Sequence, residues 1–362
     1  MKKGKKIMMV FLTGVASFFL LLIAGVFLVA FITGKGEIEP FYDEDGEILE
    51  GSVAEKIFVK INGRENGMII RGKSEDNPVL LFISGGPGVP QYWLNEYYDN
   101  KIEDYFTVCW WDYYGEGLSY DASMKGEDIT LEQLQQDAVC VAEYLKNRFG
   151  KEKVYLMAHS GGSVLGLRLA QNCPEQFYCY FAMGQMAGSR YESGYLYMKD
   201  FFEETNNKKG LRLLEKHIEE KDGEIILYNR KGLGADWEKA LLMAGCATTR
   251  EMRSDCFEIF FPQIFSRCYT IKEKVDYWRG KALCQNSAYA DEKIEVKNEA
   301  AVKIPIYFIS GRYDYTCPVT LTEELYYNLD APEKALYIFE DSAHSPLWEE
   351  NEAVLEVMLQ ER

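Results

Sequence analysis

The stretch from Val154 to Leu167 reads VYLMAHSGGSVLGL, and it decides the fold that we expect for this chain. It begins as the apolar run of a buried strand, and a helix pattern follows its glycines. A serine exposed at such a strained strand-to-helix turn needs small residues two positions to either side, here Ala158 and Gly162. The pattern predicts Ser160 as a nucleophile, with the N–H of Gly161 facing the oxyanion that forms during attack.

Other short apolar runs recur along the chain, and several are continuous, as strands covered by helices on both faces require. Thr130–Phe149 lies between two of these runs, carries apolar residues at helical spacing and is followed by Gly150, a common helix stop. This alternation predicts a mostly parallel, eight-stranded α/β sheet. The predicted strands are Lys56–Asn62, Met68–Arg71, Val79–Ser84, Phe106–Trp111, Val154–Ala158, Tyr178–Met183, Ile304–Ser310 and Ala335–Glu340.

A glycine-rich loop, Gly85-Gly86-Pro87-Gly88, directly follows the predicted strand Val79–Ser84. Acyl transfer needs a second backbone donor opposite the serine, and a bend at the end of this strand can supply it. Pro87 has no N–H, so the donor is Gly86 or Gly85.

Two later strands lead into segments that carry an acid and a base. Ile304–Ser310 runs into a loop that contains Asp314, and Ala335–Glu340 runs into a loop that contains His344. The chain order serine, aspartate, histidine is the order that this arrangement of strands uses. We therefore expect His344 to take the proton of the serine and Asp314 to orient the imidazole. Asp341 is a rival acid, but it is too close in sequence to His344 to come from the neighbouring strand.

These motifs together resemble the proline iminopeptidase (prolyl aminopeptidase) branch of the α/β-hydrolases. The resemblance lies in Gly85–Gly88, in WDYYGEGLS at 111–119, in the serine turn and in GRYDYTCP at 311–318, and it covers roughly residues 55–185 and 303–348. It implies the α/β-hydrolase fold, an acyl-enzyme mechanism, and cap acids that hold the free amine of the substrate. The chain departs from the pattern at Ser84, where the branch has His, at Tyr113-Tyr114, where it has Gln-Arg, and at Gly161, where it has Trp.

The alternation of predicted strands and helices does not continue over residues 189–303. This stretch is rich in aromatic residues and shows helical patterns. Because this stretch lies between two core strands, we expect an inserted helical cap. The predicted division is 1–35 as a Lys-rich start and membrane anchor, 36–55 as a linker, 56–188 with 304–362 as the core, and 189–303 as the cap.

The amino-terminal segment has the composition of a membrane span. Ile7–Ile32 is uncharged over 26 residues, more than the roughly 20 that cross a bilayer and the roughly 7–15 of a signal-peptide core. Lysines precede the run and acids follow it, which predicts a single-pass anchor with the catalytic domain outside the cytoplasm. Cleavage as a signal peptide after Val29-Ala30 is the alternative.

Charge and composition exclude several partners. The net charge is −17, and the first 36 residues hold five lysines and no acid, so the remainder carries −22, which argues against nucleic acid as a partner. Nine cysteines without a C-x-x-C pair, beside three histidines, give a zinc site little support. We expect no cofactor and no metal, because neither a phosphate-binding loop nor a dinucleotide fingerprint is present.

The sequence leaves three functions open. The first is an aminopeptidase of proline iminopeptidase type that acts on a small peptide. The second is a carboxylesterase or lipase that uses the aromatic cap as an acyl pocket. The third is a non-catalytic, membrane-tethered receptor for a ligand. The complete set of serine, histidine and aspartate weighs against the third.

Overall fold

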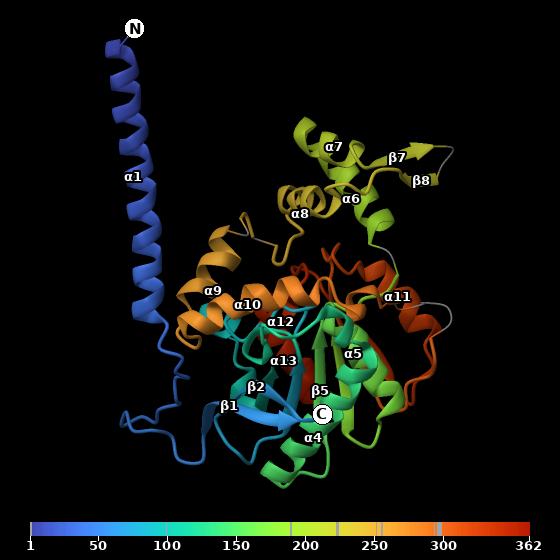
Figure 1. The fold of residues 1–362 in the computed structure, drawn as a ribbon. Coiled ribbons are helices and arrows are strands. Elements are labelled where there is room, and N and C mark those ends of the chain that lie inside the picture. Colours follow the sequence, from blue (N-terminus) through green and yellow to red (C-terminus); the bar gives the residue numbers. More distant parts are fainter. Residues whose placement is uncertain are drawn as a thin grey trace.

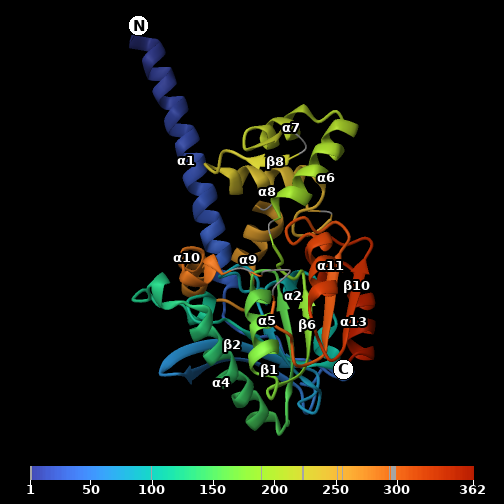
Figure 2. The ribbon, with the colours of Figure 1, turned by 90° about the vertical axis from the view of Figure 1, so that its right-hand side faces the viewer.

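An eight-stranded sheet forms the centre of the molecule (Figures 1 and 2). The computed structural model describes residues 2–98, 100–188, 190–221, 224–250, 252–254, 256–292, 294 and 299–362. The strand order is β1-β2-β4-β3-β5-β6-β9-β10, and every neighbouring pair from β4 onward is parallel. The strands are β1 (Val53–Ile61), β2 (Arg64–Gly72), β3 (Val79–Ile83), β4 (Thr107–Trp111), β5 (Val154–His159), β6 (Phe177–Met183), β9 (Ile306–Gly311) and β10 (Lys334–Phe339).

The prediction of a mostly parallel α/β sheet is confirmed. The largest difference in bounds is at β2, which begins at Arg64 instead of Met68, because its first residues pair antiparallel with β1 although they are polar. Ile83 of β3 lies opposite both Trp111 of β4 and Ala158 of β5. The carboxyl ends of the parallel strands therefore meet at one edge of the sheet, where a ligand is expected to bind in such folds.

Helices cover both faces of the sheet. Leu81 and Ile83 belong to the core beneath α4 (Leu131–Phe149) and α5 (Gly162–Asn172), whereas Leu80 and Phe82 belong to the core beneath α13 (Asn351–Gln360). Alternate residues of β3 are thus buried on opposite faces, which explains the continuous apolar run. Thr130 caps α4 by accepting a hydrogen bond from the Gln133 N–H at 3.2 Å, and Gly150 ends the helix with a φ of 61°.

The shorter elements of the core occupy its connecting loops. They are α2 (Leu94–Tyr97), α3 (Ile102–Tyr105), α11 (Val319–Asn328), α12 (Pro346–Glu349), and the single turns η1 (Gly117–Ser119) and η2 (Gly126–Asp128).

The insertion between β6 and β9 lies over the carboxyl edge of the sheet (Figure 1). It contains helices, as expected, but also the antiparallel hairpin β7–β8, which the prediction of a helical cap missed. Each of these strands has only four residues, too few for a period-2 pattern to stand out. Ser189, where we expected the cap to begin, lies outside the described residues. The elements are α6 (Tyr191–Glu204), α7 (Lys208–Glu215), β7 (Ile218–Lys221), β8 (Glu224–Leu227), α8 (Leu233–Ala244), η3 (Cys256–Phe260), α9 (Phe261–Phe265), α10 (Ile271–Cys284) and η4 (Ala288–Asp291).

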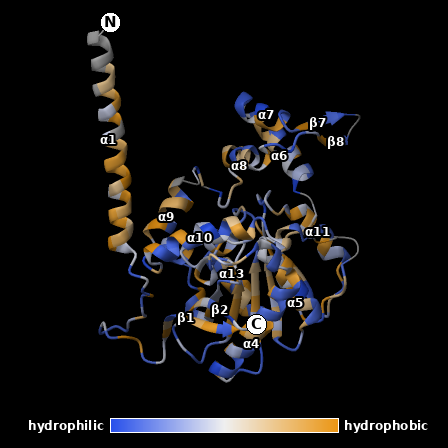
Figure 3. Ribbon diagram, viewed as in Figure 1, coloured by the Kyte–Doolittle hydropathy of each residue, from blue (hydrophilic) through white to orange (hydrophobic). Residues whose placement is uncertain are grey.

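The amino-terminal helix α1 (Lys2–Thr33) projects away from the body (Figure 3). Its segment Phe11–Thr33 is long and apolar enough to cross a membrane, and it is the one such helix among the residues described. Its last turn contacts the cap, because the Lys274 ammonium donates to the Ala30 carbonyl at 3.3 Å and the Gly36 N–H donates to the Arg267 carbonyl at 3.0 Å.

Candidate active site

Ser160 occupies a strained turn between β5 and α5. Its φ is 53°, a left-handed conformation that costs energy for a residue with a side chain. The Ser160 N–H donates to the Met183 carbonyl of β6 at 3.1 Å, which holds the turn against the sheet. A Cβ at Gly162 would lie 2.2 Å from the Ser84 carbonyl oxygen, so the close approach of two strand ends requires glycine there.

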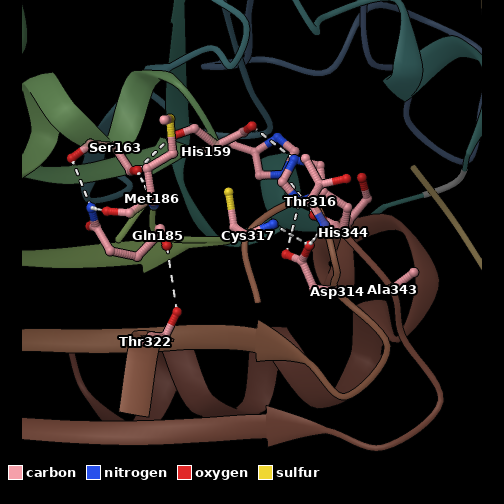
Figure 4. A network of polar contacts seen from close by, with 12 residues as sticks. His159, Ser163, Gln185, Met186, Asp314, Thr316, Cys317, Thr322, Ala343 and His344 are labelled. Atoms are coloured by element: carbon pink, nitrogen blue, oxygen red, sulfur yellow. Dashed lines mark hydrogen bonds and ion pairs between the residues drawn. The ribbon is translucent and has the colours of Figure 1, made fainter. Parts of the chain in front are cut away.

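His344 and Asp314 lie beside this serine, as the order of the motifs predicts. Figure 4 shows the contact between Asp314 and His344. His344 Nε2 is 2.8 Å from Ser160 Oγ, and His344 Nδ1 is 2.8 Å from Asp314 Oδ2. The Thr316 and Cys317 N–H groups donate to Asp314 Oδ1 at 2.9 and 2.7 Å. Asp314 is fully buried, and its other oxygen, Oδ2, is left for the imidazole. The acid that contacts His344 is therefore Asp314 and not its rival Asp341.

A half-buried carboxylate fixes the loop that carries His344. Glu349 accepts hydrogen bonds from the N–H groups of Ala343 and Ser345, at 3.0 Å each, on either side of the histidine. Burial raises the pKa of Glu349, and the backbone donors oppose that rise. The backbone at His344 is thus held from both sides, which limits how far the imidazole can turn.

The glycine-rich loop after β3 faces the serine. The Gly85 N–H donates to Gln91 Oε1 at 3.0 Å, so this amide is already engaged and is not a free donor. Among the described residues, neither the Gly86 N–H nor the Gly161 N–H donates a hydrogen bond. Of the two loop residues that the sequence left open, the geometry therefore favours Gly86, together with Gly161, as the pair that binds an oxyanion.

Gly161 and Gly86 are packed backbone against backbone. A Cβ at Gly161 would lie 2.4 Å from the Gly86 carbonyl oxygen and 2.7 Å from its carbonyl carbon. The φ of Gly161 is −53°, so contact rather than conformation requires glycine here. The tryptophan that the resembled branch has at this position would not fit beside this loop.

The loop after β4 is hydrogen-bonded to the glycine-rich loop. The Gly88 N–H donates to the Tyr113 hydroxyl at 2.6 Å. Beneath Tyr113, burial raises the pKa of Asp112 to about 8, and burial and then the neighbouring Asp112 raise the pKa of Glu116 well above its usual value.

The cap touches the serine turn directly. Tyr289 of η4 is buried, and its hydroxyl donates to the Gly161 carbonyl at 2.8 Å. Tyr289 belongs to no motif, and nothing in the sequence pointed to it, or to Gln91, as part of the site. His159 could have been noticed, because it precedes the serine in the turn.

A cavity of about 700 Å³ adjoins the site beneath the cap. Cys317 lines it, and burial keeps the pKa of the Cys317 thiol well above its usual value. One wall is apolar and comes from the hairpin, and the charged residues at the rim have both signs. The lining comprises Met186, Ala187, Gly188, Arg190, Tyr191, Glu192, Ile218, Ile225, Leu227, Arg230, Ala290, Glu292, Ile294, Thr316, Cys317 and Pro318.

The donor set at the site does not fit a metal ion well. Asp314, Cys317 and His344 each place one ligand atom within 4.8 Å of the others. However, Asp314 and His344 are hydrogen-bonded to each other, and a buried thiol with a raised pKa is not the thiolate that metals bind. Asp314 and His344 are arranged to move a proton rather than to coordinate a cation.

In two comparisons with known proteins, the chain is similar to aminopeptidases. The model of the serine aminopeptidase S33 family matches residues 101–225. The probable aminopeptidase YbaC of Bacillus subtilis (strain 168) is 29% identical over 313 residues, which are 83% of this chain and 93% of that protein.

Two solved structures show the same architecture. The proline iminopeptidase of Mycobacterium smegmatis has a TM-score of 0.59 at 14% identity, covering 84% of this chain and 97% of the other. A proline iminopeptidase-related protein of Thermus thermophilus has a TM-score of 0.52 at 17% identity, covering 85% and 97%. At these identities the likeness is one of fold.

Proposed function

The chain is an α/β-hydrolase similar to proline iminopeptidases, and from this premise we propose that it is a serine aminopeptidase that works through an acyl-enzyme. The observation that carries the proposal is the continuous hydrogen-bonded chain from Ser160 Oγ through His344 to Asp314, with 2.8 Å at each step. Nucleophile, base and orienting acid stand within the reach that this chemistry requires.

The reaction follows from these contacts. Ser160 Oγ attacks the carbonyl carbon of the first peptide bond while its proton passes to His344 Nε2. Asp314 stabilises the imidazolium that forms, and the Gly86 and Gly161 amides bind the oxyanion. His344 then protonates the departing amine, which leaves an ester on Ser160. A water molecule, deprotonated by His344, hydrolyses that ester and restores the serine.

The cavity supports a peptide substrate with a free amine. Glu192 and Glu292 lie at its rim, and neither carboxylate has an ion-pair partner among the described residues. Ile218, Ile225 and Leu227 give it an apolar wall, which suits an apolar first side chain. We assign the rim carboxylates to the substrate ammonium and the wall to its side chain.

Substrate charge tests this assignment. An aminoacyl anilide should be hydrolysed faster than its N-acetylated twin, because only the anilide has an ammonium for Glu192 and Glu292. Both carboxylates are exposed, so each pair should contribute up to about 1 kcal/mol, which is about a fivefold preference. Equal rates for the two would contradict the aminopeptidase and favour the carboxylesterase alternative, for which the apolar wall would hold an acyl chain.

A fluorophosphonate probe tests the mechanism independently of the substrate. We expect the full-length protein to react with the probe, and the Ser160→Ala variant to lose both labelling and turnover, apart from the residual rate that the oxyanion site supplies. Ser123→Ala, at an exposed hydroxyl remote from the triad, is the matched control. Absence of labelling in the folded wild type would instead favour the non-catalytic receptor.

We further propose that α1 anchors the enzyme in a membrane, with the body on the outer side. The length and composition of Phe11–Thr33 support the span. The lysines before it and the acids after it support the orientation.

A further inference from the structure

Two buried polar side chains connect parts of the site that come from different strands. Gln91 follows the glycine-rich loop after β3, and His159 ends β5, directly before the serine. Gln91 Nε2 is 2.7 Å from His159 Nδ1, and His159 Nε2 is 2.7 Å from the backbone carbonyl oxygen of His344. Both side chains are almost fully buried, with 6% and 2% of their surfaces exposed.

The donors and acceptors in this series of hydrogen bonds, from Gly85 to His344, can be assigned in one way only. The Gly85 N–H can only donate, so Gln91 presents its oxygen to Gly85 and its amide NH₂ to His159. His159 Nδ1 must then accept, which places the ring proton on Nε2, where it donates to the His344 carbonyl. The hydrogen bonds run without interruption from the glycine-rich loop, through the serine turn, to the backbone of the base.

We propose that Gln91 and His159 are positioning residues that hold the oxyanion loop and His344 in register with Ser160. The inference rests on the serine mechanism proposed above. Sheet pairing fixes β3 against β5, but the Gly86 amide and His344 lie on loops beyond the paired residues. Reacting groups must be held to within about 0.5 Å, and such precision on loops requires hydrogen-bonded support.

The same hydrogen bonds require His159 to be neutral. Its ring centroid is 4.6 Å from that of His344, which becomes a cation during turnover. Burial, and secondarily His344 itself, lowers the pKa of His159 well below its usual value. Protonation would also place an N–H at Nδ1 against the amide NH₂ of Gln91. His344 can therefore accept its proton without a second positive charge beside it.

The test compares two variants with a control in the full-length protein. Gln91→Leu removes the centre of the hydrogen-bonded chain, and His159→Phe keeps the ring but removes both nitrogens. Gln171→Leu is the control, because Gln171 is similarly buried (4% exposed) and hydrogen-bonded, but lies at the far end of α5.

We expect Gln91→Leu to lower both kcat and the fluorophosphonate labelling rate by about 10- to 100-fold, as for a displacement of up to about 1 Å, while KM changes less than about threefold. Gln171→Leu should lower Tm similarly but leave kcat unchanged. The double variant Gln91→Leu/His159→Phe should be no slower than the slower single variant, because the first change already breaks the chain.

Three outcomes would overturn the inference. One is a Gln91→Leu enzyme with wild-type kcat and labelling rate. Another is a multiplicative loss in the double variant, which would mean that the residues act separately. A third is an equal loss of kcat in Gln171→Leu, which would mean that the loss in Gln91→Leu results from lower stability of the fold. Failure of the proposed function is distinguishable, because the wild type itself would then not be labelled.

Discussion

Gly161→Ala probes how closely the serine turn and the oxyanion loop are packed. The φ of −53° at this position suits alanine, so the backbone conformation offers no resistance. The added Cβ, however, would lie 2.4 Å from the Gly86 carbonyl oxygen, where real Cβ atoms essentially never approach within 3.0 Å. The neighbour is backbone, so the loop itself must retreat by about 0.6 Å or more to accept the methyl group.

The expected cost follows from what Gly86 does. Its N–H is one of two proposed oxyanion donors, and losing one such donor lowers kcat by about 10²- to 10³-fold. A displacement of this size should produce about a 10²-fold loss, which is about 2.7 kcal/mol of transition-state stabilisation. KM should change little, because the contact forms only as charge develops on the carbonyl oxygen.

The assay is steady-state turnover of an aminoacyl anilide, with Tm measured on the same samples. Gly210→Ala, in α7, is the control, because its Cβ would lie 2.5 Å from the Phe202 ring of α6, remote from the site. It should destabilise the fold by about 1–3 kcal/mol without lowering kcat. A Gly161→Ala enzyme with kcat within threefold of wild type would refute the reasoning.

Three further outcomes are expected. Asp314→Asn should lower kcat by about 10⁴-fold with little change in Tm, because an amide no longer holds the His344 tautomer; a loss below tenfold would contradict the role of Asp314. Hydrogen bonds from Lys216 and His217 lower the pKa of Asp236 from 3.8 to about 2. The stabilisation is therefore complete above pH 3.8 and lost as pH falls towards 2, and a pH series of Tm should show a shallower acid decline in Asp236→Asn. Protease added to intact cells should release an active fragment cut within residues 36–52, whereas protection until lysis would reverse the orientation.

Much of the core could be predicted because local pattern and tertiary environment agree in it. Strands such as β3 are buried on both faces, so every position is apolar and the run is conspicuous in the sequence. Ser160 and Asp314 could be selected because each follows a strand of this kind. His344 follows β10, the half-buried edge strand, which is still apolar enough to be predicted. Parallel strands bring their carboxyl ends to one edge of a sheet, and the structure places the three side chains there.

The parts that escaped prediction depend on contacts between distant segments. Gln91 belongs to no sequence motif. It reaches His159 only because β3 and β5 are neighbours in the sheet. Tyr289 reaches the serine turn from the insertion, which has no regular repeat of strands. Gly85 could not be separated from Gly86 until Gln91 was seen to engage its amide.

The cap has two parts, which attach to different loops of the core. Its α10–η4 part is fastened to the serine turn by Tyr289, and a Cβ at Gly280 of α10 would lie 2.7 Å from the Gly115 carbonyl oxygen. The part formed by α6–α8 and the hairpin has a hydrophobic cluster around residues such as Phe202 and Trp237, and Tyr315 of the Asp314 loop packs against it.

The two attachments would respond differently if α6–α8 moved to admit substrate. Tyr289 would stay on the Gly161 carbonyl and keep the oxyanion site intact, whereas the contact between Tyr197 and Tyr315, beside Asp314, would break. Opening of the cap would then interrupt the acid and base but not the oxyanion site, and catalysis would resume on closure.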